Sequence, residues 1–166
     1  MKISKQGIDL LKHFESYEMK AYTCPAGVWT IGWGFTRFNG VKVKEGDIMP
    51  LEIANIELIK QLRTYENVVR KAIMIKKINQ SQYDALVSLC YNIGGSSFRR
   101  SNIVKLINSR NFIGACRIFN LWSKASGKRS KGLLRRRVSE RNLFCGWIDP
   151  IVSVVPENYQ ETYKEL

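Results

Sequence analysis

The chain has 166 residues, of which 45% are hydrophobic and 25% charged, and its formal net charge is +13 at pH 7. A chain of this length buries about 70% of its unfolded surface, so one compact domain needs no metal or disulfide to hold it. No apolar run approaches the roughly 20 residues that cross a bilayer. The positive charge favours an anionic partner: nucleic acid, an anionic membrane face or an acidic cell-wall polymer.

The N-terminus and the cysteines indicate which cellular compartment the protein is made for. The start, MKISKQGIDLLKHFE, interrupts its apolar residues with polar ones and lacks the continuous apolar stretch of a secretory signal. The four cysteines are Cys24, Cys90, Cys116 and Cys145, and no two of them form a C-x-x-C pair. We therefore expect reduced thiols and neither a metal site nor a redox motif.

The first part of the chain predicts one helix followed by a small sheet. Apolar spacing predicts an amphipathic helix over residues 3–14, with Glu15 at or just past its end. From Tyr22 to Val43 the chain is rich in β-branched and aromatic residues, with a turn at Pro25-Ala26-Gly27. Asn39-Gly40 predicts a hairpin turn. A sheet of two or three strands is the simplest interpretation.

The rest of the chain predicts helices. Pro50 precedes a long amphipathic pattern from Leu51 to Val69, and Ser81 to Asp84 has the form of a capping box. The further helices predicted are one from Tyr83 to the Gly94-Gly95 stop, two shorter ones over 102–108 and 111–122, and a last one beginning near Leu133.

Strands that come early and helices that come late indicate the α+β class. We expect a small β lobe at about 15–46 and a larger helical lobe, joined by the long helix, with a cleft between them. Residues 1–148 form the predicted domain. We assign no role to the tail at 149–166.

Glu15, Cys24 and Thr30 are the candidate reactive groups. A strand that turns back after Cys24 brings this carboxylate, thiol and hydroxyl together. A cysteine hydrolase would need a histidine, and the only one, His13, would point to a different side of the helix. A metal hydrolase lacks its ligand set. Glycoside hydrolysis needs an acid and a group that places water, which this cluster can supply.

Three blocks of the sequence resemble one family. Glu15, Cys24 and Thr30 with TIGWG are the first, QYDALVSLCYNIGGSSFRRSNIVKLIN is the second, and FNLWSKASGKRSKGLLRRRVSERNLF is the third. Together they resemble the phage-type lysozymes, glycoside hydrolase family 24. The resemblance covers residues 3–146 and implies an α+β lysozyme fold, cleavage of the β-1,4 bond between N-acetylmuramic acid and N-acetylglucosamine in peptidoglycan, and no cofactor.

The resemblance also implies roles for single residues. Glu15 matches the general acid and Thr30 the hydroxyl that helps to hold the attacking water. Cys24 stands where many members carry aspartate. A free cysteine is mostly neutral at pH 7, so three roles stay open for it: a minor thiolate that acts as base, a direct nucleophile, or a neighbour that only binds water. Tyr91 and Asn92 match positions that line the cleft.

The basic run from Lys128 to Arg141 has two interpretations. It is a solvated helix face with Glu140 as partial counter-charge, or it attracts the anionic cell envelope. In the second case one of Arg135, Arg136 and Arg137 turns inward and orients Glu15, and the periodicity favours Arg137.

Two alternatives to a hydrolase follow from the same residues. A lytic transglycosylase cleaves the same bond with a single acid, and a catalytically silent module would only bind the wall. Nucleic acid is disfavoured because the basic run has no aromatic companions. We further expect a monomer that collects in the host cytoplasm and reaches the wall through a separately encoded pore-forming protein.

Overall fold

The computed structural model describes residues 1–24, 26–125, 127–146, 149–152 and 154–155. The chain divides into two compact units. The small unit is residues 11–64, and the helical unit is residues 1–10 together with the chain from residue 65 onward. The boundaries fall inside α1 (Lys5–Glu15) and α2 (Leu51–Ala72). Among the described residues, none of the helices combines the length and the apolar character needed to cross a bilayer.

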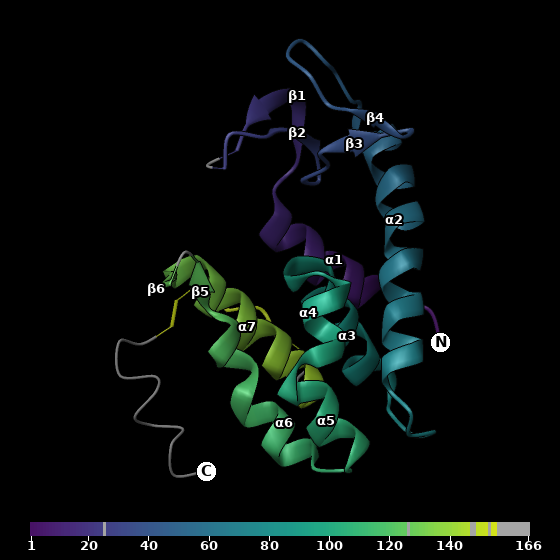
Figure 1. Ribbon diagram of the computed structural model, residues 1–166, viewed down its shortest axis with the longest axis vertical. Coiled ribbons are helices and arrows are strands. Elements are labelled where there is room, and N and C mark those ends of the chain that lie inside the picture. The colour runs from purple at the N-terminus through teal and green to yellow at the C-terminus, as the bar shows by residue number, and fades with distance from the viewer. Residues whose placement is uncertain (25, 126, 147–148, 153, 156–166) are drawn as a thin grey trace. The chain divides into compact units, whose positions relative to one another are not determined.

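The small unit contains two hairpins (Figure 1). Strand β1 (Glu18–Thr23) pairs antiparallel with β2 (Trp29–Gly32), and β3 (Arg37–Phe38) pairs antiparallel with β4 (Val41–Lys42). Asn39 and Gly40 join β3 to β4 with φ of 48° and 81°. Because two-residue hairpin turns favour positive φ at both positions, the Asn-Gly pair is well suited to this turn. The predicted hairpin is confirmed.

The first strand begins earlier than the sequence pattern indicates. β1 starts at Glu18, and five of its six residues are exposed, so no apolar alternation marks it. Backbone hydrogen bonds hold it instead. The Ala21 N–H donates to the Asp47 carbonyl at 2.9 Å, and the Met49 N–H donates to the Met19 carbonyl at 2.8 Å. β1 therefore lies between β2 and the segment that leads into α2.

A tight turn follows β2. The backbone groups of Ile31 and Phe35 bond to each other in both directions, at 2.8 and 2.9 Å. Gly32 within this turn has φ of +64°, and a Cβ there would lie 2.9 Å from Met49 Sδ. The position therefore requires glycine both for its conformation and for space. The side chains of Ile31, Phe35 and Met49 form the core beneath the turn.

The helical unit is built around α3 (Gln80–Ile93), in which every residue from Tyr83 to Cys90 is buried. α3 packs against the long last helix α7 (Lys131–Phe144), as Figure 1 shows. The elements between them are α4 (Gly95–Arg100), α5 (Asn102–Asn108), α6 (Phe112–Ile118), the 3-10 helix η1 (Phe119–Trp122), and the short strands β5 (Lys124–Ala125) and β6 (Lys128–Arg129).

Most of the predicted helices are present, but the predicted capping box is wrong. Asn79, not Ser81, caps α3: its side chain accepts from the Gln82 N–H at 2.8 Å, and Gln82 Oε1 accepts from the Asn79 N–H at 3.0 Å. Asp84 is fully buried and accepts from the Ser4 N–H at 2.9 Å instead. The Asp84 carboxylate, which the local pattern predicts to be part of the cap, therefore binds Ser4, 80 residues away in the sequence.

Two further details differ from the sequence analysis. Helix α4 fills a stretch for which no helix is predicted, and the chain between the predicted helix over 111–122 and the last predicted helix contains the β5–β6 hairpin. The start of the predicted tail packs on α7, because Ser139 Oγ accepts from the Val152 N–H at 3.0 Å and the Pro150 carbonyl accepts from Asn142 at 3.3 Å. Residues 153 and 156–166 of that tail lie outside the described residues.

Candidate active site

Glu15 is the last residue of α1, and its side chain is half-buried. The next residue, Ser16, has φ of 50°, so the chain leaves the helix through a left-handed residue and enters β1 almost at once. The TIGWG turn comes back to the same carboxylate. A Cβ on Gly34 would lie 3.4 Å from Glu15 Oε2, and Gly34 has φ of +92°. Backbone without a side chain therefore lies against the acid.

An aromatic cluster fixes the end of α1 against the turn. The rings of Tyr17 and Trp33 lie 5.5 Å apart, and Lys12 Nζ lies 5.1 Å from the centre of the Trp33 ring. Trp33 Nε1 donates to Asn55 Oδ1 at 3.1 Å, and the Tyr17 hydroxyl donates to the Met49 carbonyl at 2.6 Å. Aromatic side chains that pack together, and whose polar atoms also form hydrogen bonds, are held in one position. The residues next to Glu15 are therefore anchored to α2 and to Met49, which lies just before α2.

Cys24 and Thr30 face each other across the β1–β2 hairpin. Thr30 is 4% exposed and pairs with Tyr22, while Cys24 directly follows β1 and is half-buried. The Cys24 N–H donates to the Val28 carbonyl at 3.0 Å, and the Gly27 N–H donates to the Cys24 carbonyl at 2.8 Å. The predicted turn includes Pro25, which lies outside the described residues.

Hydrogen bonds lower the pKa of Cys24. The backbone N–H of Val28 has the largest effect, followed by that of Ala26, and the Thr30 hydroxyl adds a smaller one against the opposing effect of burial. Donors that point at the sulfur stabilise the thiolate more than the thiol. The Thr30 hydroxyl has one proton, and it also donates to the Val28 carbonyl at 3.0 Å. It therefore serves either that carbonyl or the thiolate, and its lone pairs stay available to water.

Tyr22 belongs to this cluster, and the sequence analysis missed it. It is paired directly with Thr30, so the two side chains share one face of the hairpin. Partial burial raises the pKa of the Tyr22 phenol, and negative charges nearby raise it further. Those charges belong to Cys24, Glu18 and Glu15, in order of falling effect. The pairing register between the two strands was the signal that could have found it.

The other predicted site residues lie in the helical unit. Arg137 is fully buried, and its Nη2 donates to Asn92 Oδ1 at 3.1 Å and to Glu140 Oε1 at 3.0 Å. Tyr91 is half-buried and its ring lies 5.0 Å from that of Tyr65. Arg137 and Asn92 are therefore brought together, while the action of Arg137 on Glu15 stays a prediction.

The interpretation of the basic run as a solvated face is wrong for its centre. Arg136 and Glu140 are buried like Arg137, and Glu140 Oε1 also accepts from Arg136 Nε at 3.1 Å and from Ser88 Oγ at 2.7 Å. Spacings of three and four residues align these side chains on the face of α7 that meets α3. Exposed cations remain at Lys128, Arg129, Lys131 and Arg135.

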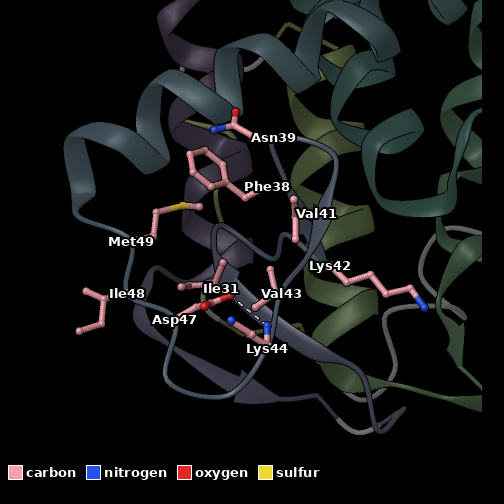
Figure 2. A pocket seen from close by; sticks show the side chains of 10 residues that line it. All are labelled: Ile31, Phe38, Asn39, Val41, Lys42, Val43, Lys44, Asp47, Ile48 and Met49. Carbon is pink, nitrogen blue, oxygen red and sulfur yellow. Dashed lines mark hydrogen bonds between the residues drawn. The ribbon is translucent and has the colours of Figure 1, made fainter.

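The small unit also contains a pocket of about 330 Å³, which is separate from the predicted site residues of that unit (Figure 2). The β3–β4 hairpin and the segment from Asp47 to Met49 line it, and neither Glu15, Cys24 nor Thr30 is among its lining residues. Asp47 accepts from the Lys44 N–H at 3.0 Å at its rim. Within the described part of the chain, no group of three or more metal-binding side chains is present.

Comparison with known proteins agrees with the sequence pattern. The phage lysozyme family model matches residues 12–140. The chain is 37% identical to an endolysin of Acyrthosiphon pisum secondary endosymbiont phage 1, with 87% of this chain and 98% of the relative covered. It is 39% identical to the endolysin of Salmonella phage P22, with the same coverage of both.

Solved structures show the same fold. An endolysin from Escherichia coli O157:H7 phage FAHEc1 superposes with a TM-score of 0.83 at 34% identity, covering 95% of this chain and 98% of that one. The superposition includes nearly all of both chains, so the predicted α+β lysozyme fold class is confirmed.

Proposed function

This chain belongs to the phage lysozyme family, and we propose that it is an endolysin that hydrolyses the β-1,4 bond between N-acetylmuramic acid and N-acetylglucosamine in peptidoglycan. The observation that supports this most is local to the small unit. One short segment contains a half-buried carboxylate next to a glycine turn, and a hairpin in the same segment has a thiol with a lowered pKa next to a buried hydroxyl.

Glu15 acts as the general acid in this proposal. Cleavage breaks the bond between the sugar C1 and the bridging oxygen, and that oxygen must take up a proton as it leaves. Glu15 gives this proton from its carboxyl group. Gly34 supports the step because it has no side chain that would stand between the carboxyl group and an incoming sugar.

Cys24 and Thr30 place the water that attacks C1. Water adds its oxygen to C1, and one of its protons leaves to a base. The N–H groups of Val28 and Ala26 favour a Cys24 thiolate that accepts this proton. Thr30 accepts a hydrogen bond from the same water while its own proton goes to the Val28 carbonyl. The roles of Cys24 as nucleophile or as passive neighbour remain alternatives.

Tyr91 and Asn92 are proposed to bind the glycan, with Arg137 as the positioning residue behind them. Arg137 donates to the Asn92 amide oxygen, so the amide group is held in one orientation. The exposed cations near the start of α7 supply attraction to an anionic envelope. The proposal requires no cofactor and treats the protein as a monomer that reaches the wall after a separate pore-forming protein opens the membrane.

A lytic transglycosylase is the second candidate, because Cys24 leaves the cluster without a second carboxylate. In that reaction the muramic acid 6-hydroxyl attacks C1 in place of water. Digestion of purified peptidoglycan and mass analysis of the fragments distinguishes the two. We expect a reducing N-acetylmuramic acid end, and a 1,6-anhydro end would overturn the hydrolase. Release of N-acetylglucosamine ends would overturn the proposed bond, and unchanged glycan would leave only a wall-binding module.

A further inference from the structure

Two cysteines far apart in the sequence meet in the helical unit. Cys116 in α6 and Cys145 at the C-terminal cap of α7 are 29 positions apart, yet their Sγ atoms lie 2.7 Å from each other. Both are free thiols. A disulfide bond brings two sulfurs to about 2.05 Å, so little movement separates this contact from a bond.

Aromatic ring contacts connect the elements that carry the two thiols. The Phe144 ring lies 5.4 Å from that of Phe119 and 6.5 Å from that of Phe112. Phe112 and Phe119 lie four residues before and three residues after Cys116, and so on its side of the helix. Phe144 directly precedes Cys145. This aromatic cluster keeps the two sulfur atoms close without a covalent bond.

The two thiols differ in reactivity and in access. Cys145 is exposed, and its pKa is lowered to about 7, first by a hydrogen bond from Cys116 and then by Arg141 against the opposing effect of burial. Cys116 is half-buried, and its pKa is raised, first by its hydrogen bond to Cys145 and then by burial. An exposed thiolate beside an arginine is the kind of cysteine that attacks disulfides.

We propose that Cys116 and Cys145 form a redox site that closes to an intramolecular disulfide by exchange with a small disulfide such as oxidised glutathione. The Cys145 thiolate attacks the oxidant, forms a mixed disulfide and releases one glutathione thiolate. Cys116 then loses its proton, attacks Cys145 Sγ and releases the second glutathione. Two protein thiols become one disulfide, and oxidised glutathione is reduced to two glutathione thiols.

The disulfide would join α6 to the end of α7 and close a loop that contains η1, the β5–β6 hairpin and all of α7. Closing such a loop restricts the unfolded chain. In a reducing compartment the two cysteines stay as thiols, and in an oxidising compartment they form the disulfide. The helical unit would therefore gain stability in the oxidising compartment. Cys90, which is fully buried, takes no part.

The test treats the purified full-length chain with oxidised glutathione, followed by alkylation under denaturing conditions and mass analysis. We expect Cys116 and Cys145 to escape alkylation, whereas all four cysteines of the reduced chain are alkylated. The peptides of Cys116 and Cys145 should be linked. The melting temperature should rise by roughly 5–15 °C relative to the same sample in dithiothreitol.

Single variants separate the two steps. Cys116→Ser should stop at a stable glutathione adduct on Cys145, whereas Cys145→Ser should react slowly and leave Cys116 unmodified. Both should unfold at the temperature of the reduced wild type with or without oxidant. Four alkylated cysteines in treated wild type, a persistent glutathione adduct on Cys145 without closure, or a disulfide that links other cysteines would overturn the proposal.

Discussion

Glu15 and Glu140 are two carboxylates with opposite surroundings. Glu15 is half-exposed at a helix end, with bare glycine backbone against it. Glu140 is fully buried, and Ser88, Arg136 and Arg137 all donate to its Oε1. Of the two, only Glu15 has a face that another molecule can reach.

The difference separates a group available for chemistry from a group used for packing. A buried charge needs full pairing, because leaving it alone in the core costs several kcal/mol. A carboxylate that gives a proton to a ligand must keep one side open. Sequence position does not distinguish the two, since both glutamates lie near the ends of helices with basic neighbours.

The largest effect on stability should come from Glu140→Gln. The change removes a buried negative charge that both Arg136 and Arg137 contact, so we expect a loss of about 3–5 kcal/mol in the free energy of unfolding. Urea denaturation followed by circular dichroism measures it. Asp9→Asn is the matched control, because Asp9 pairs with Lys5 at the surface and should cost under about 1 kcal/mol. Equal losses would mean that the Glu140 cluster is not the structural site described.

The role of Cys24 is tested by the pH dependence of wall hydrolysis. Activity should rise with pH as the thiol loses its proton, and the hydrogen bonds that lower the pKa of Cys24 should bring this rise below pH 9. Cys24→Asp should move the pH optimum of hydrolysis to lower pH, because a carboxylate loses its proton at lower pH than a thiol does. Cys24→Ser should lower activity roughly 100-fold and abolish the rise.

Cys116→Ser is the control for that series and should keep the wild-type profile. If Cys24→Ser instead matches wild type at every pH, the thiolate is not the base. Cys24 would then be a neighbour that only binds water.

Gly34→Ala tests the open face of Glu15. The methyl group would lie against Glu15 Oε2, so turnover should fall roughly 10–100-fold. Gly40→Ala separates contact from backbone strain, because Gly40 also has positive φ but a Cβ there meets nothing within 4 Å. Both variants should lose stability, and only Gly34→Ala should lose turnover. Similar turnover in the two would remove Gly34 from the site.

The smallest effect expected concerns the cap of α3. Asn79→Ala removes the side-chain acceptor for the Gln82 N–H and should cost about 1 kcal/mol of unfolding free energy. Ser81→Ala should change it by less than about 0.5 kcal/mol. Thermal unfolding of the two variants side by side measures both, and the reverse order would restore the cap that the sequence pattern predicts.

Features set by neighbours in sequence could be predicted, and features set by distant partners could not. The Asn39-Gly40 turn, the long helix α2 and the approach of Cys24 to Thr30 across one hairpin all depend on short stretches of chain. The burial of Asp84 depends on Ser4, and that of Glu140 depends on Ser88. Spacing along one helix cannot reveal such partners, because packing between helices decides which polar side chains are buried.

The strand β1 and the meeting of Cys116 with Cys145 were missed for related reasons. β1 is exposed and held by backbone bonds, so its side chains carry no alternating pattern. The two thiols meet only because α6, η1 and the end of α7 pack around three aromatic rings. Tyr22 could have been found from the predicted turn after Cys24. A hairpin in which Cys24 pairs with Val28 places Tyr22 opposite Thr30.

The most direct test of the account measures turnover of peptidoglycan and thermal unfolding for Glu15→Gln beside Glu18→Gln. Glu18 is an exposed carboxylate three positions along the same segment and serves as the matched control. We predict that Glu15→Gln loses activity roughly 10²–10⁴-fold while it unfolds at the wild-type temperature, and that Glu18→Gln keeps both properties. Wall hydrolysis by Glu15→Gln at the wild-type rate would contradict the assignment of Glu15 as the acid.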